Sequence, residues 1–218
     1  MHQTTNGKFD ELVGDFAKEG IELVMPDHKL ELPEGSEFLS ENAYTKAKAA
    51  AEQTGLYSLG DDSGVFIEAL DYMPGDHSRR WFGSETDDES RNEKILELMK
   101  NEDNRTAYLI SRFSLVNPDG DEIYRCVVKN EYSISDAPAG EHGFGYDRIL
   151  IPTTDMWDYA LEHNTENATN AYNVFFNSED DECEYPTVAE MTQDEKNAIT
   201  YRGRIAKPIS EKLKGLQQ

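Results

Sequence analysis

The sequence predicts a single domain that contains both α-helices and β-strands. The chain has 218 residues, which is enough for one well-filled domain. Apolar residues at positions 9, 12, 13 and 16 have the spacing of a helix, whereas residues 105–116 alternate as a strand does. No internal repeat and no linker rich in proline, glycine or serine divides the chain.

The chain is strongly acidic. It carries 44 aspartate and glutamate residues against 21 lysine and arginine residues, which gives a formal net charge of -23. Such a surface repels the phosphate backbone of DNA and RNA, so the composition argues against a nucleic-acid-binding protein. If the ligand is itself a polyanion, its site needs local cations and a metal ion to overcome the field of the whole chain.

The sequence shows neither a membrane segment nor a disulfide framework. No apolar run approaches the length of a membrane span, and the opening Met1-His2-Gln3 is not that of a signal peptide. Cys126 and Cys183 are too few and too far apart to suggest a disulfide framework or a zinc site. We therefore expect a cytoplasmic protein without membrane contact.

The first half of the chain predicts helices and strands in turn. Thr4-Thr5-Asn6-Gly7-Lys8 leads into the first helix, and free backbone N–H groups with a lysine suit an anion at a helix N-terminus. Residues 21–25 predict a strand. The alanine-rich stretch 38–51 predicts a helix that Thr54-Gly55 ends.

The middle of the chain predicts a helix and a hairpin. Residues 86–101 form an amphipathic pattern, with Thr86 or Asp87 as the expected N-cap. The residues expected on its buried face are Ile95, Leu96, Leu98 and Met99. Residues 105–132 predict two strands joined by a turn at 117–120.

The last third begins with a segment that breaks the pattern. Residues 153–185 are polar but carry scattered aromatic residues, so we expect part of the segment to pack on the domain or on a partner chain. Thr192 and Glu195 predict a capping box at the start of a short helix. A final helix reaches Lys214, and Pro208 predicts a kink or a restart within it.

Asp61 and Asp62 are the residues around which the chemistry is organised. Gly60 and Gly64 bracket them, and Ser63 follows at once. In extended chain, successive side chains point to opposite faces, so one aspartate can hold a metal while the other acts as a base. Two adjacent carboxylates repel, and a divalent cation relieves that repulsion. The alternative interpretation is an acidic turn between two strands.

Two further stretches carry candidate binding residues. Residues 79–83 combine two arginines with a tryptophan and a phenylalanine, which suits either a phosphate contact or an arginine stacked on an aromatic surface. Residues 140–147 contain three glycines, which let backbone approach a ligand closely, and two aromatic residues that can stack on a flat group.

Together these stretches occur in the order found in one protein family. The order resembles that of the inosine triphosphate pyrophosphatases, also called XTP/dITP diphosphatases, over about residues 4–152 and 186–215. The stretches that carry the resemblance are Asn6-Gly7-Lys8, Leu32-Pro33-Glu34, Glu41-Asn42-Ala43 with Lys46-Ala47, Asp61-Asp62-Ser63-Gly64, Gly143-Phe144-Gly145-Tyr146-Asp147, Glu195-Lys196-Asn197 and Arg202-Gly203-Arg204.

The resemblance implies a fold and an activity. The implied fold is α/β, an elongated mixed β-sheet flanked by helices, with two lobes around a central nucleotide-binding cleft. It implies one domain over residues 1–218, with an insertion at about 153–185, that assembles as a homodimer. The implied activity is Mg²⁺-dependent hydrolysis of ITP, dITP and XTP to the monophosphate and pyrophosphate, which keeps deaminated purines out of nucleic acid.

The resemblance also implies roles for individual residues. Asp62 would be the general base, and Glu34, Asp61 and Asp62 would hold or support Mg²⁺. Residues implied in binding the triphosphate or lying beside the base catalyst are Thr5, Asn6, Lys8, Lys46, Ser63 and Arg80. Residues implied in framing and recognising the purine are Phe144, Gly145, Tyr146, Asp147, Lys196, Tyr201 and Arg202.

Two alternatives accompany this expectation. Tyr201 stands where the family has histidine, and a phenol is larger and takes no positive charge near neutral pH, so the same chemistry with a shifted base preference is one alternative. The short segment before Thr4 motivates the other, a nucleotide-binding protein with impaired catalysis. Intact Glu34, Asp61 and Asp62 favour an active enzyme.

Overall fold

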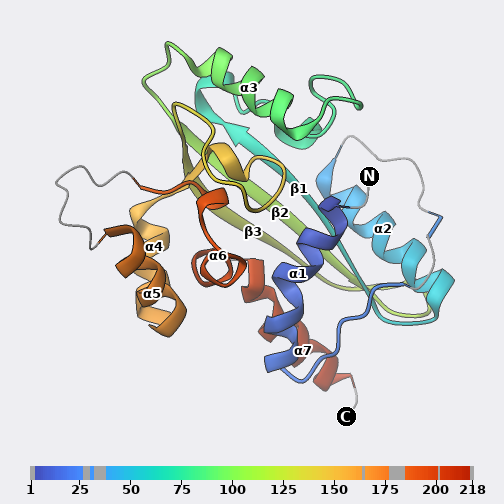
Figure 1. Cartoon of the computed structure of the whole chain (residues 1–218). Helices are drawn as coiled ribbons and strands as arrows, with labels where there is room; N and C mark the ends of the chain where they lie inside the picture. Colours follow the sequence, from blue (N-terminus) through green and yellow to red (C-terminus); the bar gives the residue numbers. More distant parts are fainter. Residues whose placement is uncertain are drawn as a thin grey trace.

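A four-stranded antiparallel sheet forms the centre of the molecule (Figure 1). The structure is a computed structural model that describes residues 3–26, 30–31, 38–163, 165–176, 185–200 and 202–216. Its strands, in spatial order, are β1 (Ser58–Ile67), β2 (Thr106–Val116), β3 (Glu122–Ile134) and β4 (Leu150–Pro152). Its α-helices are α1 (Gln3–Lys18), α2 (Leu39–Thr54), α3 (Asp88–Met99), α4 (Thr154–His163), α5 (Thr165–Phe176), α6 (Gln193–Ile199) and α7 (Ala206–Gly215).

The three long strands pair in a continuous register that aligns residues across the sheet. Asp61 lies opposite Phe113, and Ser63 lies opposite Ser111. Because side chains alternate along a strand, Asp61, Ser63 and their partners share one face of the sheet. β1 lies at one edge of the sheet in the described part of the chain.

Two apolar clusters lie at opposite ends of this sheet face. One includes Ile67, Ala107 and Tyr132, and the other includes Phe113 and Leu115. Because the register places Asp61, Ser63 and Ser111 between these ends, a polar belt lies on β1 and β2 where the two clusters meet. This division corresponds to the two lobes that the resemblance implies.

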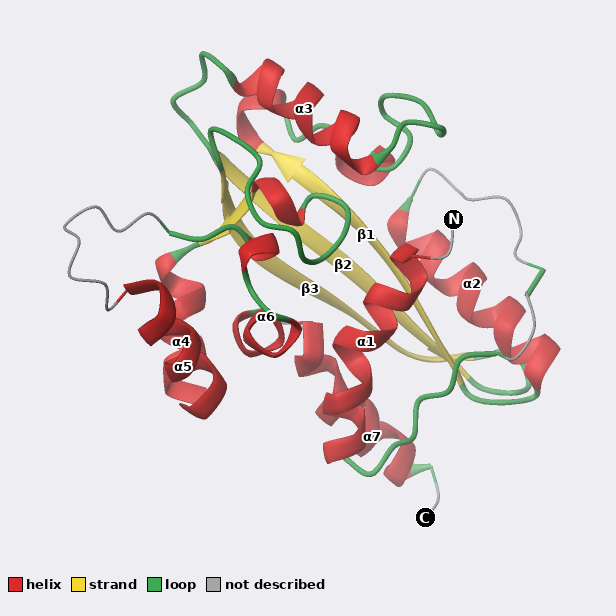
Figure 2. Cartoon of the chain, viewed as in Figure 1, coloured by secondary structure: helices red, strands yellow, loops and turns green. Residues whose placement is uncertain are grey.

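Different helices pack on the two faces of the sheet (Figure 2). α1 and α7 bury Leu12, Phe16 and Ile209 in the cluster around Phe113. α2 packs against β1 and β2 so closely that a Cβ atom on Gly60 would overlap the carbonyl oxygen of Ala43. Gly60 and Asp61 are neighbours in β1, so their Cβ positions point to opposite faces of the sheet. α1 packs on the face that carries Asp61 and Phe113, and α2 therefore packs on the other face.

Most of the predicted elements are confirmed. The α/β class with a sheet flanked by helices is confirmed, although every strand pair in the described ranges is antiparallel and none supplies the parallel component of a mixed sheet. Gly55 ends α2 in the left-handed region with φ 68°, Asp87 caps α3, and the capping box of Thr192 and Glu195 is present. Part of residues 153–185 packs on the domain, because Trp157 of α4 is buried in the cluster around Ile67.

Four local predictions are wrong. The stretch 4–8 is the first part of α1 rather than a loop before it, because the helix begins at Gln3. Residues 21–25 form no strand; Ile21 and Leu23 instead pack beside the cluster around Phe113. Leu98 is 47% exposed, since the buried stripe of α3 runs through Ile95 and Met99.

The fourth concerns the chain around the aspartate pair. β1 continues without a break from Ser58 to Ile67, so the alternative of an acidic turn between two strands is wrong.

Near the C-terminus, the prediction of a restart at Pro208 is confirmed. A short 3₁₀ turn at Arg202–Ile205 precedes α7, and Pro208 lies in the first turn of that helix, where its missing N–H is tolerated.

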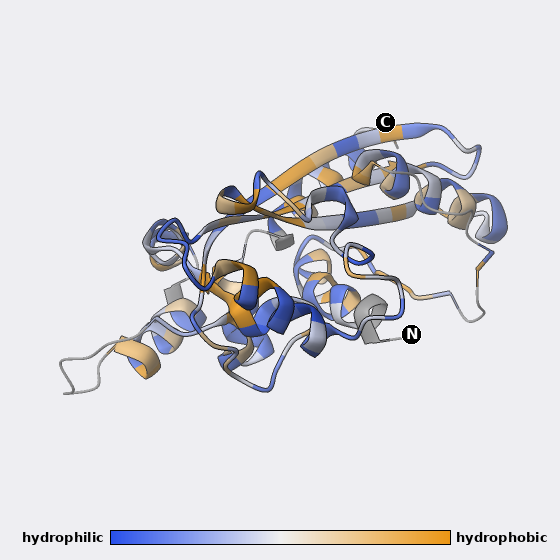
Figure 3. Cartoon of the chain, turned by 90° about the horizontal axis from the view of Figure 1, so that it is seen from above, coloured by the Kyte–Doolittle hydropathy of each residue, from blue (hydrophilic) through white to orange (hydrophobic). Residues whose placement is uncertain are grey.

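The described helices mix apolar and polar residues along their length, as the ribbon colours in Figure 3 show. Within those residues no helix has the length and apolar character that a membrane span requires.

Candidate active site

Asp61 and Asp62 point to opposite faces of the edge strand β1, and a different helix meets each of them. Lys8 of α1 lies 3.2 Å from Asp61, whereas Lys46 of α2 lies 2.6 Å from Asp62. The expectation that the pair diverges is confirmed. The alternation removes direct repulsion between the two carboxylates, and each is neutralised by an ammonium from its own side.

The carboxylate of Asp62 is held in a fixed orientation by α2. Lys46 Nζ donates to Asp62 Oδ1, and Asn42 Nδ2 donates to Asp62 Oδ2 at 2.9 Å. Asn42 and Lys46 are four residues apart, so they lie on the same side of the helix. Lys46 Nζ also lies 3.4 Å from the carbonyl oxygen of Asp61, which ties the helix to the strand backbone.

The carboxylate of Asp61 belongs to a polar network in the belt between the two apolar clusters. Ser63 Oγ donates to Asp61 Oδ1 at 3.0 Å and lies 2.9 Å from Ser111 Oγ on the neighbouring strand. Lys8 Nζ lies 3.3 Å from Ser63 Oγ. The network therefore collects hard oxygen atoms and one ammonium, a set that suits a phosphate group or a small divalent cation.

A second charged cluster lies about one helical turn further along α1. Lys196 of α6 lies 2.5 Å from Glu11 and 2.7 Å from Asp147, and all three side chains are buried. Glu11 follows Lys8 by three residues, which is a rise of about 4.5 Å along a helix. α1 thus connects the belt around Asp61 to a buried group of two carboxylates and one ammonium.

The buried cluster shifts the proton affinity of its members. Burial raises the pKa of Asp147, and it outweighs the opposing effect of the Lys196 ammonium. Burial alone would lower the pKa of Lys196, but the carboxylates of Asp147 and Glu11 outweigh it and raise that pKa. The two pKa values are thus raised for different reasons, that of Asp147 by burial and that of Lys196 by its two carboxylate partners.

The ring of Phe144 covers this cluster. Lys196 Nζ lies 4.5 Å from the ring centroid, in the geometry of a cation–π contact. The ring also lies close to α1, where a Cβ atom on Gly7 would overlap its edge atoms Cδ1 and Cε1. The backbone N–H of Phe144 donates to Asp147 Oδ2 at 2.9 Å. The aromatic residue of the glycine-rich loop is thus held beside Lys196 and Asp147.

Of the remaining predicted residues, some have side chains that the structure describes and others do not. Tyr146 is partly buried and donates its hydroxyl to the carbonyl oxygen of Ser78; burial raises its pKa. Arg80 is exposed at the surface. The structure describes no side chain for Thr5, Asn6 and Arg202, and Glu34 and Tyr201 lie outside the described residues.

Three residues of these clusters escaped the sequence analysis. Glu11 and Ser111 had no local signal, because Glu11 looks like a surface residue of an amphipathic helix and Ser111 like a polar position in a strand. Asn42 belongs to the motif Glu41-Asn42-Ala43, which by itself does not indicate a contact with Asp62. Its spacing of four residues from Lys46 was the one available signal that both meet the same partner.

The oxygen atoms near Asp61 fit a hard divalent cation. Mg²⁺ is commonly held by one or two carboxylates together with substrate phosphates and water, and Asp61 with the Ser63 hydroxyl supplies oxygens of that kind. In the part of the chain that the structure describes, no three histidine, cysteine or acidic side chains converge as a metal cage. A site completed by phosphate oxygens agrees with both observations.

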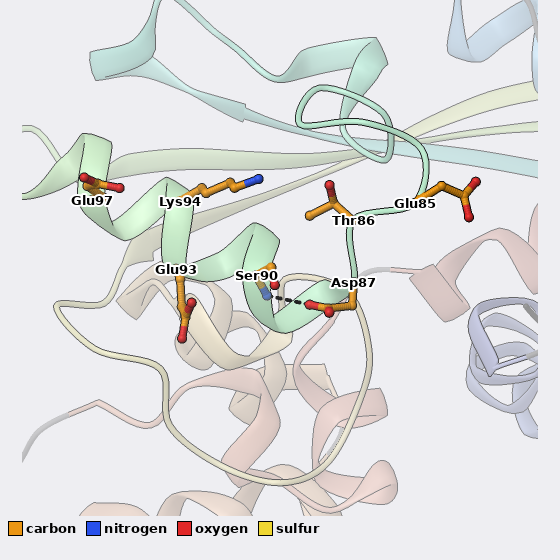
Figure 4. Close-up of a pocket in the computed structure, with 7 residues that line it drawn as sticks. All are labelled: Glu85, Thr86, Asp87, Ser90, Glu93, Lys94 and Glu97. Carbon is orange, nitrogen blue, oxygen red and sulfur yellow. Dashed lines mark hydrogen bonds between the residues drawn. The ribbon is translucent and has the colours of Figure 1, made fainter.

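A cavity of about 470 Å³ elsewhere has the wrong charge for a triphosphate. It lies at the start of α3 and is lined by Glu85, Thr86, Asp87, Ser90, Glu93, Lys94 and Glu97 (Figure 4). Four carboxylates face one ammonium there, and Asp87 is already occupied as the helix cap, accepting from the Ser90 N–H at 2.7 Å. The cluster along α1 is therefore the better candidate for an anionic nucleotide.

Comparisons with known proteins identify the family of the chain. A model of the Ham1 family matches residues 3–212. A dITP/XTP pyrophosphatase of Mycobacteroides abscessus is 32% identical over 205 residues, covering 90% of this chain and 84% of that protein. One of Aquifex aeolicus is 31% identical over 225 residues, covering 99% and 96%. A solved Ham1 protein of Staphylococcus aureus superposes with a TM-score of 0.63 at 25% identity and covers 93% of both chains. The resemblance stated from the motifs is confirmed, and the chain belongs to the Ham1 family.

Proposed function

We propose that this protein is a nucleoside triphosphate pyrophosphatase that hydrolyses ITP, dITP and XTP to the monophosphate and pyrophosphate. The names of its relatives support the substrate class. The observation that carries the proposal is the arrangement along α1. Lys8 meets Asp61 in the polar belt, and Glu11 meets Lys196 under Phe144 about one turn later, so one helix spans a phosphate end and a base end.

In the proposed reaction Asp62 is the general base. It takes a proton from a water molecule whose oxygen forms a new bond to phosphorus, while the anhydride bond between the α- and β-phosphates breaks and pyrophosphate leaves. Asn42 and Lys46 hold both carboxylate oxygens of Asp62, so its orientation is set before the substrate binds. Such preorganisation matters in phosphoryl transfer because positioning and charge neutralisation dominate it.

The proposed metal is Mg²⁺. Asp61, with Glu34 and Asp62, would hold it, and when bound it would neutralise charge on the phosphates. Lys8 and Lys46 then bind phosphate oxygens directly, with Thr5, Asn6, Ser63 and Arg80 as further contacts. The local cations overcome the net charge of -23, which would otherwise repel the substrate.

At the base end, Phe144 stacks on the purine. Asp147 and Lys196 supply hydrogen-bonding groups beneath it, and Gly145 and Tyr146 complete the loop. Tyr201 and Arg202 are the further residues that we propose for recognition of the base. Asp147 Oδ2 accepts hydrogen bonds from the Phe144 N–H and from Lys196, so its carboxyl group is held in place beside the proposed base pocket.

We also propose a homodimer that acts in the cytoplasm, where nucleoside triphosphates are the available substrates. Val127 of β3 is 52% exposed on the sheet face opposite α1, which suits contact with a second copy. Analytical ultracentrifugation of the protein and of Val127→Glu tests this, because a monomer in both samples excludes the proposed dimer. Cell fractionation with a tagged chain tests the location.

The decisive experiment is a panel of ribo- and deoxyribonucleoside triphosphates with Mg²⁺, scored for pyrophosphate against phosphate release. We expect preference for ITP, dITP and XTP and a loss of at least 100-fold in kcat for Asp62→Asn, because removal of a general base typically reduces the rate about 10²- to 10⁴-fold. Turnover centred on another base would replace this function by the same chemistry with a shifted preference. Binding without hydrolysis dependent on Asp62 would leave a catalytically impaired protein.

A further inference from the structure

We propose that Asp88 and Asn92 of α3 are positioning residues for the ring of Phe144 and set the affinity of the site for the purine base. The inference rests on the proposed function, in which Phe144 stacks on the base. It assigns to α3, which contributes no group to the reaction itself, control over the strength of nucleotide binding.

Both backbone polar groups of Gly145 are bound by these two side chains. The N–H of Gly145 donates to Asp88 Oδ2 at 2.9 Å, and Asn92 Nδ2 donates to the carbonyl oxygen of Gly145 at 3.1 Å. Residues 88 and 92 are one helical turn apart, so they form a rigid pair of acceptor and donor. The pair fixes the two peptide planes of Gly145, the first of which is shared with Phe144.

Asp88 and Asn92 thus form a clamp on Gly145, and the carboxylate of Asp88 is itself held in place. Arg91 Nη1 lies 2.5 Å from the other oxygen of Asp88, and Arg91 Nη2 donates to the carbonyl oxygen of Thr86. Arg91 is buried, so the Asp88 carboxylate is held between a fixed guanidinium and the loop. A bond to a fixed carboxylate restrains the loop more than a bond to a mobile surface side chain would.

The amide half occupies a position where stability alone would favour an apolar residue. Asn92 lies on the stripe that continues as Ile95 and Met99, and its side chain is 1% exposed. Its Oδ1 atom has no hydrogen-bond partner among the described residues. A buried unpaired acceptor weakens folding, so the amide is explained by the bond that its nitrogen makes to Gly145.

The loop transmits this restraint to the aromatic ring. Gly143 and Gly145 flank Phe144 in left-handed conformations, with φ 77° and 65°. With both neighbours so bent, the direction of the Phe144 side chain follows the placement of the Gly145 peptide. Freeing that peptide lets the ring leave its position over Lys196.

The test compares steady-state kinetics on dITP for the wild type, Asn92→Ala and Glu93→Ala. Glu93 is the next residue on the same helix and is exposed, so its variant is the matched control. For Asn92→Ala we expect KM to rise about tenfold, the value of one hydrogen bond, with kcat changed less than about twofold. Asp88→Asn keeps an acceptor for the Gly145 N–H and should raise KM less than Asp88→Ala.

A double variant separates positioning from general destabilisation. If Asn92 acts through the ring, Asn92→Ala raises KM in the wild type but not in the Phe144→Ala background. Equal effects in both backgrounds, or an unchanged KM in Asn92→Ala, overturn the inference. If Asn92→Ala folds poorly, Asn92→Leu, which restores apolar packing without the amide, replaces it with the same expectation.

The wild-type enzyme distinguishes the two levels of the proposal. If it fails to hydrolyse dITP, the proposed function falls. If it is active and the Asn92 variants match it in KM, only the role of the clamp falls. Amide hydrogen exchange of the peptide that contains Gly145, measured without nucleotide, should accelerate in Asn92→Ala and Asp88→Ala, and unchanged protection also overturns the clamp.

Discussion

The ring of Phe144 lies so close to Gly7 that a side chain at position 7 would displace it. α1 carries glycine at position 7 within its first turns, although glycine weakens a helix. The ring of Phe144 occupies the space that a side chain at this position would need. The weaker helix is thus offset by the close approach of the aromatic ring to α1.

Gly7→Ala should therefore weaken nucleotide binding without affecting the chemical step. The added methyl group displaces the ring from its position over Lys196, so we expect KM for dITP to rise about tenfold with kcat changed less than about twofold. Gly14→Ala on the same helix is the control. A Cβ atom there meets nothing within 4 Å, so that variant should keep KM and gain about 1 kcal/mol of stability. Equal KM values for both variants would contradict the prediction.

Asp147 is a buried residue of the proposed base pocket whose ionisation responds to its surroundings. Its pKa is raised by burial, so the folded chain holds this proton more tightly than the unfolded chain, whose aspartate pKa is about 3.9. Because the native state then binds more protons, the free energy of unfolding falls as the pH rises from that value through the raised pKa. The ionisation of Asp147 thus lowers the free energy of unfolding as the pH rises, whereas carboxylates with a lowered pKa raise it.

Asp147→Asn should remove this contribution. Urea unfolding measured at intervals from about pH 4 to about pH 8 should show that the variant gains stability relative to the wild type as the pH rises, because it lacks the Asp147 carboxyl, whose ionisation destabilises the wild type. Asp158→Asn, at an exposed position of α4, is the control and should follow the wild type. A constant difference between Asp147→Asn and the wild type across this range would show that the raised pKa has no effect on stability.

At the scale of elements, each face of β1 contacts a different helix. α1 serves the face of Asp61 and continues to the base end, whereas α2 serves the face of Asp62. A change in the packing of α2 should therefore affect the proposed general base and leave the base pocket intact. A change in the packing of α1 should affect the base pocket and leave the proposed general base intact.

Gly60→Ala tests this division. The new Cβ atom would overlap the carbonyl oxygen of Ala43, so α2 must move away from β1 and carry Lys46 away from Asp62. We expect a loss of about 1–3 kcal/mol in the free energy of unfolding and a fall in kcat of at least tenfold. KM for dITP should rise by a smaller factor than kcat falls, since the proposed phosphate contact of Lys46 is weakened while Phe144 lies close to α1. A rise in KM with unchanged kcat would refute the division between the faces.

The long elements were predictable from the sequence because their periodicity reports burial directly. The helix 39–54 and the hairpin 106–134 follow their patterns of apolar residues almost to the last residue. Residues 21–25 show the limit of such patterns. Ile21 and Leu23 alternate with polar residues because they pack on the cluster around Phe113, and no neighbouring strand is needed for that.

The candidate site was predictable where one local motif carries it and unpredictable where distant residues meet. Asp61, Asp62 and Lys46 belong to compact motifs, and the structure brings them together. Asp88 and Asn92, in contrast, look like polar residues on a helix surface. Only the fold brings them to Gly145, more than 50 residues further along the chain, and no pattern within a short window contains that pairing.

At the scale of the whole molecule, the net negative charge of the chain opposes the approach of the proposed substrate. The net charge is -23, yet Lys8, Lys46 and Lys196 each contact an acidic side chain in the two clusters joined by α1 and β1. A triphosphate approaching from solution meets long-range repulsion first and these ammonium groups only at contact distance. The two effects therefore differ in how strongly salt screens them.

Raising the ionic strength should increase kcat/KM for dITP before it decreases it. At about 0.1 M salt the Debye length is about 10 Å, so repulsion between the acidic surface and the distant nucleotide is largely screened, whereas contacts within about 3 Å are not. We expect kcat/KM to rise from about 10 mM to about 150 mM KCl at constant free Mg²⁺, through faster association. Replacing several exposed glutamates by glutamine, such as Glu93 and Glu97 of α3, should raise the low-salt value and flatten the curve. A monotonic fall of kcat/KM from the lowest salt would show that attraction by the site lysines already dominates at long range.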